Sequence, residues 1–471
     1  MMLRFEAISP PQMPDLVKSM AGLNPTPQTH AVSRIGPEKP TVFSGPELAA
    51  CVPRNLRYGA DWSFGDVAQS PLVNVVSAIC EKALAAAAGG NMRSLVLLAA
   101  LAASMSLSAR ALADKDADLD RCKFAGQFAK ANESIAACDR VIDDPKTAAQ
   151  DRSAALSSRC GWWWAKQDFD RALSDCNEAI RLYSGNPGPY LNRGNAYLSK
   201  SDPERALADF NAAIRLDPKS AWAYASRGNL YKNKGDADRA LADLNEAIKL
   251  DPSYALALFS RGELHKSRGN FPQAMADMNQ SLWLDPNYAP AYFTRGQLSY
   301  ILGNNPAAIE NFTKSISLDA ENGAAYFNRG VAYYIVGGRA ADAAADFRKA
   351  AELNPKDAYA ALWRDLADRR NGAPGHLAEA AKQLDMTAWP APVIRHFLGE
   401  ANAEQTFAAA FDTDPKTRLA QTCEANFYAG ELALLNKNRK EAQRLLKLAA
   451  DQCPPSFVES PAAVAELIVL N

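Results

Sequence analysis

A period of thirty-four residues runs through the middle of this 471-residue chain and constrains its fold more than any other feature. The segments 187–220, 221–254 and 255–288 align without gaps. Each has an aromatic or apolar residue at position 4, Arg-Gly at positions 7–8, a small residue at position 20 and Asp-Pro at positions 31–32. A unit this short cannot bury its apolar face alone, so successive units must stack. The period therefore predicts a solenoid.

The column pattern resembles the tetratricopeptide repeat, a helix–turn–helix unit. Clear units occupy 153–186, 187–220, 221–254, 255–288, 289–322 and 323–357, and a degenerate unit precedes them at about 115–148. The resemblance implies an all-α, right-handed solenoid of helical hairpins over residues 114–357 and a function in binding proteins. The strict period ends after Asp357. Residues 358–471 are therefore expected to form an atypical helical region.

Two columns of the repeat carry opposite charges. Position 7 holds Arg159, Arg193, Arg227, Arg261, Arg295 and Arg329, and position 23 holds Asp175, Asp209, Asp243, Asp277 and Asp346, with Asn311 in the remaining unit. Because charges matched so evenly largely cancel, we expect an ion pair between the two helices of each repeat. A row of arginines that binds an acidic ligand is the weaker alternative.

Six of the eight cysteines follow residue 113 and fall in pairs. In the repeat register, Cys160 and Cys176 lie on facing helices, at positions 8 and 24. Cys122 and Cys138 have the same separation, and Cys423 and Cys453 mark the two ends of a final helical pair. Disulfides 122–138, 160–176 and 423–453 are therefore expected, as in a protein of an oxidising compartment. Reduced core cysteines are the alternative.

Residues 92–113 have the three parts of a secretory signal in order. Met92-Arg93 is basic, an apolar run extends over 95–107, and Ala111-Leu112-Ala113 fits a small-x-small cleavage site. No cysteine follows Ala113 directly, so no lipid-attachment site is expected, and membrane association stays open. Residues 1–91 lie either upstream of the true start at Met92 or in a disordered region. The first interpretation predicts export to the periplasm, and the second a cytoplasmic or membrane-anchored protein.

The resemblance implies that the first helix of each repeat lines a concave face, mainly through positions 2, 5, 9 and 12. These columns predict a partner-binding groove of Leu191, Asn195, Asn229, Lys232, Phe293, Gln297, Tyr300, Phe327 and Tyr334. Aromatic side chains on a wet concave face suit the anchoring of apolar peptide side chains. The alternative is that they pack against the C-terminal part of the same chain. Some tetratricopeptide domains bind the terminal carboxylate of a partner through a Lys at position 5. Here Leu191 and Ala225 occupy position 5, so binding of a terminal carboxylate is not expected.

The C-terminal part has a more specific resemblance. The runs WPAPVIRHFLGEANAEQTF and CEANFYAGELALLNKNRKEAQRLLKLAADQCPPSFVES, within residues 389–460, resemble the tail of NlpI-type lipoproteins of the Gram-negative envelope. This resemblance implies a periplasmic adaptor that scaffolds envelope proteases and peptidoglycan hydrolases. The absence of a lipid-attachment cysteine departs from that family.

No pattern in the sequence indicates catalysis. The net charge of −1 does not favour nucleic-acid binding, which needs a basic surface. No glycine-rich phosphate loop follows a strand pattern, and no metal site, cofactor site or catalytic residue is expected. The sequence therefore predicts a non-catalytic periplasmic adaptor that binds proteins or peptides, of unknown oligomeric state. An intracellular interaction scaffold is one alternative, and an enzyme with an unrecognised site near Trp389–His396 is another.

Overall fold

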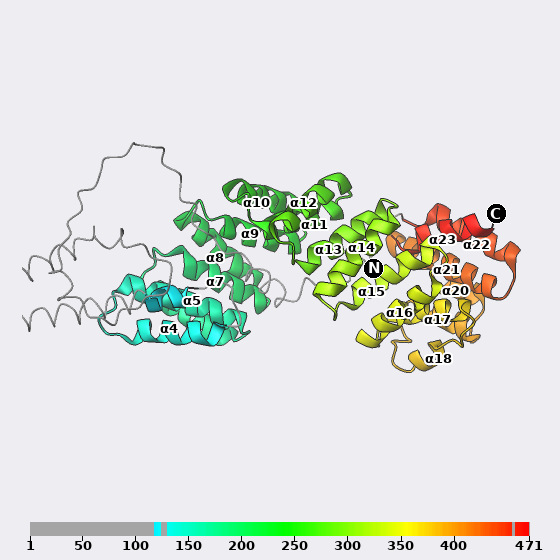
Figure 1. Ribbon diagram of the computed structural model, residues 1–471, viewed down its shortest axis with the longest axis horizontal. Coiled ribbons are helices and arrows are strands. Elements are labelled where there is room, and N and C mark those ends of the chain that lie inside the picture. Colours follow the sequence, from blue (N-terminus) through cyan, green and yellow to red (C-terminus); the bar gives the residue numbers. More distant parts are fainter. Residues whose placement is uncertain (1–116, 124–129, 455–456, 471) are drawn as a thin grey trace, which may run out of the picture.

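The computed structural model describes residues 117–123, 130–454 and 457–470, and every regular element in these ranges is a helix. The expectations for residues 1–91 and 92–113 lie outside the described residues. Helical hairpins follow one another along the long axis of the molecule, from α4 at one end to α22 and α23 at the other (Figure 1). The expectation of an all-α solenoid is confirmed.

Each sequence repeat forms one antiparallel hairpin. The hairpins are α5 (Ala149–Ala165) with α6 (Phe169–Leu182), α7 (Pro187–Ser199) with α8 (Pro203–Leu216), α9 (Ala221–Asn233) with α10 (Ala237–Leu250), α11 (Ala255–Ser267) with α12 (Phe271–Leu284), α13 (Ala289–Ile301) with α14 (Asn305–Leu318), and α15 (Gly323–Val336) with α16 (Ala340–Leu353). Residues 117–122 are helical and precede α4 (Ala131–Asp143), at the place of the degenerate unit.

The two helices of a hairpin approach closely because position 8 is glycine. A Cβ added to Gly194 would lie 2.6 Å from the Phe210 ring, and one added to Gly296 would lie 2.6 Å from the Phe312 ring. Phe210 and Phe312 are fully buried. The bulky residue at position 24 thus fills the space that glycine leaves at position 8.

The turn between the two helices needs a residue whose backbone is in the left-handed conformation. Gly235, Gly269 and Gly303 supply it with φ of 77°, 75° and 76°. Three other turns place a side chain there, since Gln167 has φ 62°, Ser201 has φ 59° and Lys437, in the C-terminal hairpin, has φ 62°. A left-handed residue with a Cβ costs about 1–2 kcal/mol relative to glycine in this conformation.

We expect Ser201→Gly to raise the stability of the repeats and Gly235→Ala to lower it, each by about 1 kcal/mol. A Cβ at Gly235 meets nothing within 4 Å, so only the backbone conformation is tested there. Thermal unfolding followed by circular dichroism measures both variants. Equal melting temperatures for the two variants would contradict this account of the turn.

The charged columns at positions 7 and 23 form the expected ion pairs. Arg193 contacts both carboxylate oxygens of Asp209, and Arg227 contacts both carboxylate oxygens of Asp243, with N···O distances of 2.7–2.8 Å. Each arginine also reaches the preceding repeat, as Arg227 Nη1 donates to Asn211 Oδ1 at 2.7 Å. The arginine column therefore joins helices within a repeat and repeats to one another, so its role is structural.

Three disulfides occur in the described residues, between Cys122 and Cys138, Cys160 and Cys176, and Cys423 and Cys453. Their Cα atoms lie 4.7, 5.6 and 5.0 Å apart. These are the pairs that the repeat register predicts. The 160–176 disulfide occupies the place of the glycine and the bulky side chain in other hairpins.

The C-terminal region is helical, as expected, and departs from the repeat. Its helices are α17 (Ala358–Arg370), α18 (Leu377–Ala380), α19 (Ala391–Leu398), α20 (Ala403–Ala409), α21 (Pro415–Leu435), α22 (Arg439–Gln452) and α23 (Glu459–Leu470). Helices α21 and α22 form a hairpin like the repeats, with Gly430 packed on Leu446. The sequence pattern gave no indication of α20 or α23. No helix in the described part of the chain is long and apolar enough to cross a membrane.

Candidate functional site

The concave face of the solenoid is divided into a closed and an open part. The closed part includes five of the residues predicted to bind a partner, namely Phe293, Gln297, Tyr300, Phe327 and Tyr334. Each of these side chains is at most 8% exposed. The prediction that they line an accessible groove is therefore wrong. Tyr300 and Tyr334 contact the C-terminal region of the same chain, whereas Gln297 accepts a hydrogen bond from Lys266 and Phe293 packs on Phe312 of its own repeat.

The cover of the closed face comes from the C-terminal region. The Tyr300 hydroxyl donates to the carbonyl oxygen of Val458 at 3.2 Å, and the Tyr334 hydroxyl donates to Glu431 Oε2 at 2.9 Å. Helix α23 packs on α22 and also contacts α15. In Figure 1, α21, α22 and α23 lie beside the α15 end of the repeat array. The chain therefore occupies this stretch of its own concave face.

Buried glutamates hold this cover in place. Arg370 on α17 donates to Glu431 on α21 and to Glu466 on α23, each at 2.6 Å. Glu424 accepts from Trp389 Nε1 at 2.7 Å and from the Tyr359 hydroxyl at 3.0 Å. The buried glutamates in the described residues are Glu424, Glu431, Glu459 and Glu466. No pattern identified in the sequence predicted this network.

The network makes stability depend on pH. Burial raises the pKa of Glu431 from 4.5 to about 7, despite the attraction of Arg370 and with added repulsion from Glu466. Between these values the folded protein binds a proton that the unfolded chain does not. The stability that Glu431 contributes is therefore full below about pH 4.5 and is lost as the pH rises to about 7.

We expect Glu431→Gln to weaken the pH dependence of the melting temperature between pH 5 and 7. The glutamine keeps an oxygen that accepts from Tyr334 and Arg370 but does not titrate. Thermal unfolding of the two proteins at pH 5, 6 and 7 measures the effect. Glu400→Gln, at an exposed position, is the matched control. An unchanged slope in Glu431→Gln would assign the pH dependence to other groups.

The open part of the concave face belongs to the earlier repeats. It comprises Leu191, Asn195 and Leu198 on α7, and Trp222, Asn229 and Lys232 on α9, and we call it the open face. All six side chains are half-buried, between the core and full exposure. Trp222 stacks on Tyr254 with ring centroids 6.0 Å apart. Four of the predicted groove residues, Leu191, Asn195, Asn229 and Lys232, thus remain reachable from solvent.

A polar row on α11 and α13 separates the open from the closed face. Lys266 Nζ lies 3.0 Å from Glu263 Oε1 and donates to Gln297 Oε1 at 2.8 Å. The Thr294 hydroxyl donates to Glu263 Oε1 at 2.8 Å. Burial alone would raise the pKa of Glu263, yet that pKa is lowered because the charges of Lys266 and Lys232 outweigh burial. The row is therefore an internally paired charge network.

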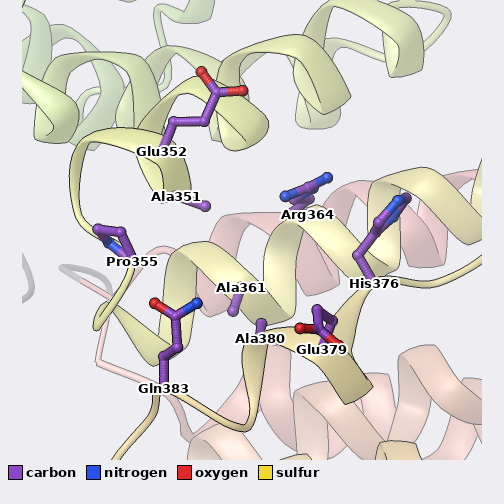
Figure 2. Close-up of a pocket in the computed structure, with 9 residues that line it drawn as sticks. All are labelled: Ala351, Glu352, Pro355, Ala361, Arg364, His376, Glu379, Ala380 and Gln383. Carbon is purple, nitrogen blue, oxygen red and sulfur yellow. The ribbon is translucent and has the colours of Figure 1, made fainter.

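A separate cavity of about 320 Å³ lies where the strict repeat ends, between α16, α17 and α18 (Figure 2). His376 Nδ1 lies 3.1 Å from a carboxylate oxygen of the buried Asp368, which also pairs with Arg364 at 3.5 Å. The lining residues are Ala351, Glu352, Pro355, Ala361, Arg364, His376, Glu379, Ala380 and Gln383. None of them is a Ser, Cys or Lys that His376 would activate as a nucleophile.

The segment from Trp389 to His396 has a structural role in the described residues. Trp389 is fixed by its hydrogen bond to Glu424, which α21 carries. His396 is half-buried, and burial lowers its pKa. No group of three or more His, Cys, Asp or Glu side chains that could hold a metal occurs in the described part of the chain. The geometry near Trp389–His396 gives no support to the enzyme alternative.

Comparison with known proteins agrees with this architecture. A family model described as TPR repeat matches residues 194–235 and 228–267, and one described as Tetratricopeptide repeat matches residues 293–358. No curated protein sequence matches the chain. The resemblance of residues 389–460 to NlpI-type lipoproteins is not reproduced among these family models.

Several solved structures are similar to part of the chain. YrrB, described as a TPR protein with an unusual peptide-binding site, is 25% identical with a TM-score of 0.34, over 39% of this chain and 95% of its own. PilF of Pseudomonas aeruginosa is 17% identical with a TM-score of 0.40, over 46% and 94%. A thermophilic TPR protein of Thermus thermophilus is 18% identical with a TM-score of 0.34, over 38% and 98%.

Sequence period, hairpin geometry and family matches point to the same class. Repeats of this kind form scaffolds for protein–protein interaction. Together with the glycine, arginine and aspartate columns that build each hairpin, these matches show that the chain is a tetratricopeptide repeat protein.

Proposed function

We propose that this protein is a non-catalytic adaptor of the periplasm, which holds a segment of a partner protein on the open face. The observation that carries the proposal is the contrast between the two parts of the concave face. The closed face is filled by the chain's own C-terminal region, whereas the open face leaves half-buried apolar and polar side chains in reach of solvent. Such a surface is suited to a peptide in an extended or helical form.

Two observations favour export. Residues 92–113 have the order of a secretory signal, and the six later cysteines are paired. Disulfides persist in oxidising compartments such as the periplasm. The resemblance of residues 389–460 to NlpI-type lipoproteins adds a partner class, envelope proteases and peptidoglycan hydrolases, whose activity the adaptor would regulate.

Photo-crosslinking in the native cell tests the binding surface. A photoreactive amino acid at Asn195 or Trp222 is expected to yield a covalent adduct with a partner protein. The control position is Gln280, which is exposed on α12, the second helix of its repeat. Adducts from Gln280 alone would place the interaction on another surface. Mass spectrometry of the adduct then shows whether the partner is an envelope protease or hydrolase.

The intact mass of the unreduced protein tests the compartment. A species that starts at Asp114 and lacks six hydrogens is expected, since a signal would be removed and three disulfides formed. A species that contains residues 1–91 and free thiols would contradict export and favour an intracellular scaffold.

A further inference from the structure

The open face contains one cation, Lys232, whose charge interacts with that of Glu263 but which forms no hydrogen bond or ion pair with the described residues. Lys266 and Glu263, one repeat further on, contact each other, and Gln297 and Thr294 complete their hydrogen bonds. Lys232, at the same repeat position as Lys266, makes no hydrogen bond or ion pair with the described residues. Its neighbour on the next repeat, Glu263, is already held by two other groups.

The surroundings of Lys232 make this lack of a partner costly. Burial lowers the pKa of Lys232, because the ammonium has lost part of its water; the charge of Glu263 opposes this effect and that of Lys266 adds to it. A charge removed from water is favourable only when another charge or several hydrogen bonds replace the water. An incoming anionic group would supply what the folded chain does not.

An unpaired acceptor lies one helical turn away. The side-chain oxygen Oδ1 of Asn229 is buried and accepts no hydrogen bond from the described residues. Asn229 and Lys232 are three residues apart on α9 and so share one face of the helix. A ligand that satisfies both groups therefore presents an anion to Lys232 and an N–H donor to Asn229 Oδ1.

We infer that the segment held on the open face is extended and contains an aspartate or glutamate, whose carboxylate accepts from Lys232 Nζ while a backbone N–H near it donates to Asn229 Oδ1. This inference rests on the proposed function, since it names the chemistry of the segment bound at the same surface. A peptide backbone supplies N–H donors at every residue except proline, and a carboxylate is the common anionic side chain of proteins.

The neighbours of Lys232 define the rest of the segment. On the α7 side lie Leu191 and Leu198, which favour an apolar side chain. Repeats place their first helices about 10 Å apart, and an extended peptide advances about 3.3 Å per residue, so that apolar side chain lies about three residues from the acid. On the α11 side, Glu263 repels a second acid. The expected ligand has a single acid beside an apolar residue rather than an acidic run.

The open face extends from Lys232 toward α7, and the polar row of α11 and α13 adjoins it on the other side. The inference assigns the anion to an acidic side chain within the segment rather than to the terminal carboxylate of a chain. The position also differs from that of the lysine in carboxylate-gripping repeats, where this chain has Leu191 and Ala225.

A matched pair of peptide pools tests the inference with the full mature chain. Both pools contain decapeptides with acetylated and amidated ends and one leucine three residues from a central position. That position is Asp or Glu in one pool and Asn or Gln in the other. We expect the acidic pool to bind about tenfold more tightly, as for one hydrogen-bonded ion pair. This preference should disappear in Lys232→Met and persist in Lys249→Met, at an exposed position of α10.

Each other outcome overturns a specific statement. Equal binding of the two pools, or a preference that survives in Lys232→Met, would overturn the inference and leave the proposed function intact. A preference for acid that requires a free carboxyl terminus would assign the anion to a chain end. If neither pool binds while crosslinks from Asn195 persist, the partner segment is not acidic. If crosslinks fail as well, the proposed function fails. Circular dichroism confirms that Lys232→Met is folded.

Discussion

Replacing Trp363 with alanine is expected to lower the stability of the C-terminal half of the molecule by about 3–5 kcal/mol. Trp363 is fully buried on α17, and its ring lies 5.2 Å from Tyr334, 5.5 Å from Phe347 and 5.4 Å from Phe427, between ring centroids. These partners belong to α15, α16 and α21, so one side chain joins the last repeat to the C-terminal hairpin. Its removal leaves a large cavity that a solenoid end cannot easily fill.

Urea unfolding monitored by near-ultraviolet circular dichroism measures the loss, because that signal comes from aromatic side chains packed in the folded state. Trp283→Ala is the matched control, since Trp283 is 80% exposed and should change stability by less than about 0.5 kcal/mol. The indole N–H of Trp363 makes no hydrogen bond in the described part of the chain, so Trp363→Phe is expected to lose much less. Similar losses for the alanine and phenylalanine variants would argue against packing as the cause.

Replacing Arg370 with methionine is expected to cost about 3 kcal/mol at pH 8. Arg370 is the cation that contacts Glu431 and Glu466, and methionine keeps most of its apolar volume. Two buried carboxylates would then remain close together without a positive charge. The loss should shrink as the pH falls, because protonation removes the charge that the arginine neutralised.

A double variant separates this effect from simple loss of packing. Adding Glu431→Gln to Arg370→Met should restore part of the stability at pH 8, since only Glu466 then remains charged. Arg444→Met, which breaks a pair on the solvated surface of α22, serves as the control and should change stability little. An equal loss for Arg370→Met at pH 5 and pH 8 would mean that the carboxylates are not the cause.

Features that depend on one repeat and its neighbour could be predicted from the sequence. The pairing of Arg227 with Asp243 followed from two columns of opposite charge sixteen residues apart, and the 160–176 disulfide followed from the same spacing. In each case the repeat fixes the distance, so a position in the register is equivalent to a position in space.

Features that depend on distant parts of the chain could not be predicted in this way. The Tyr300 hydroxyl meets a carbonyl 158 residues later, and Arg370 meets Glu466 after 96 residues. A repeat register says nothing about a helix that folds back over it, so Tyr300 and Tyr334 had the same pattern as accessible groove residues. The other four predicted groove residues, Leu191, Asn195, Asn229 and Lys232, are half-buried, and their place in a binding groove stays a prediction.

The positions of the disulfides determine how the molecule would respond to a pulling force. The loops that the three disulfides close span 16, 16 and 30 residues. Together they shorten the fully extended chain by about 200 Å. No cysteine lies between Cys176 and Cys423, so the repeats from α7 to α16 have only noncovalent resistance to extension. Tension from a bound partner would therefore unfold the middle of the solenoid, where the open face lies, before it unfolds either of the disulfide-bonded ends.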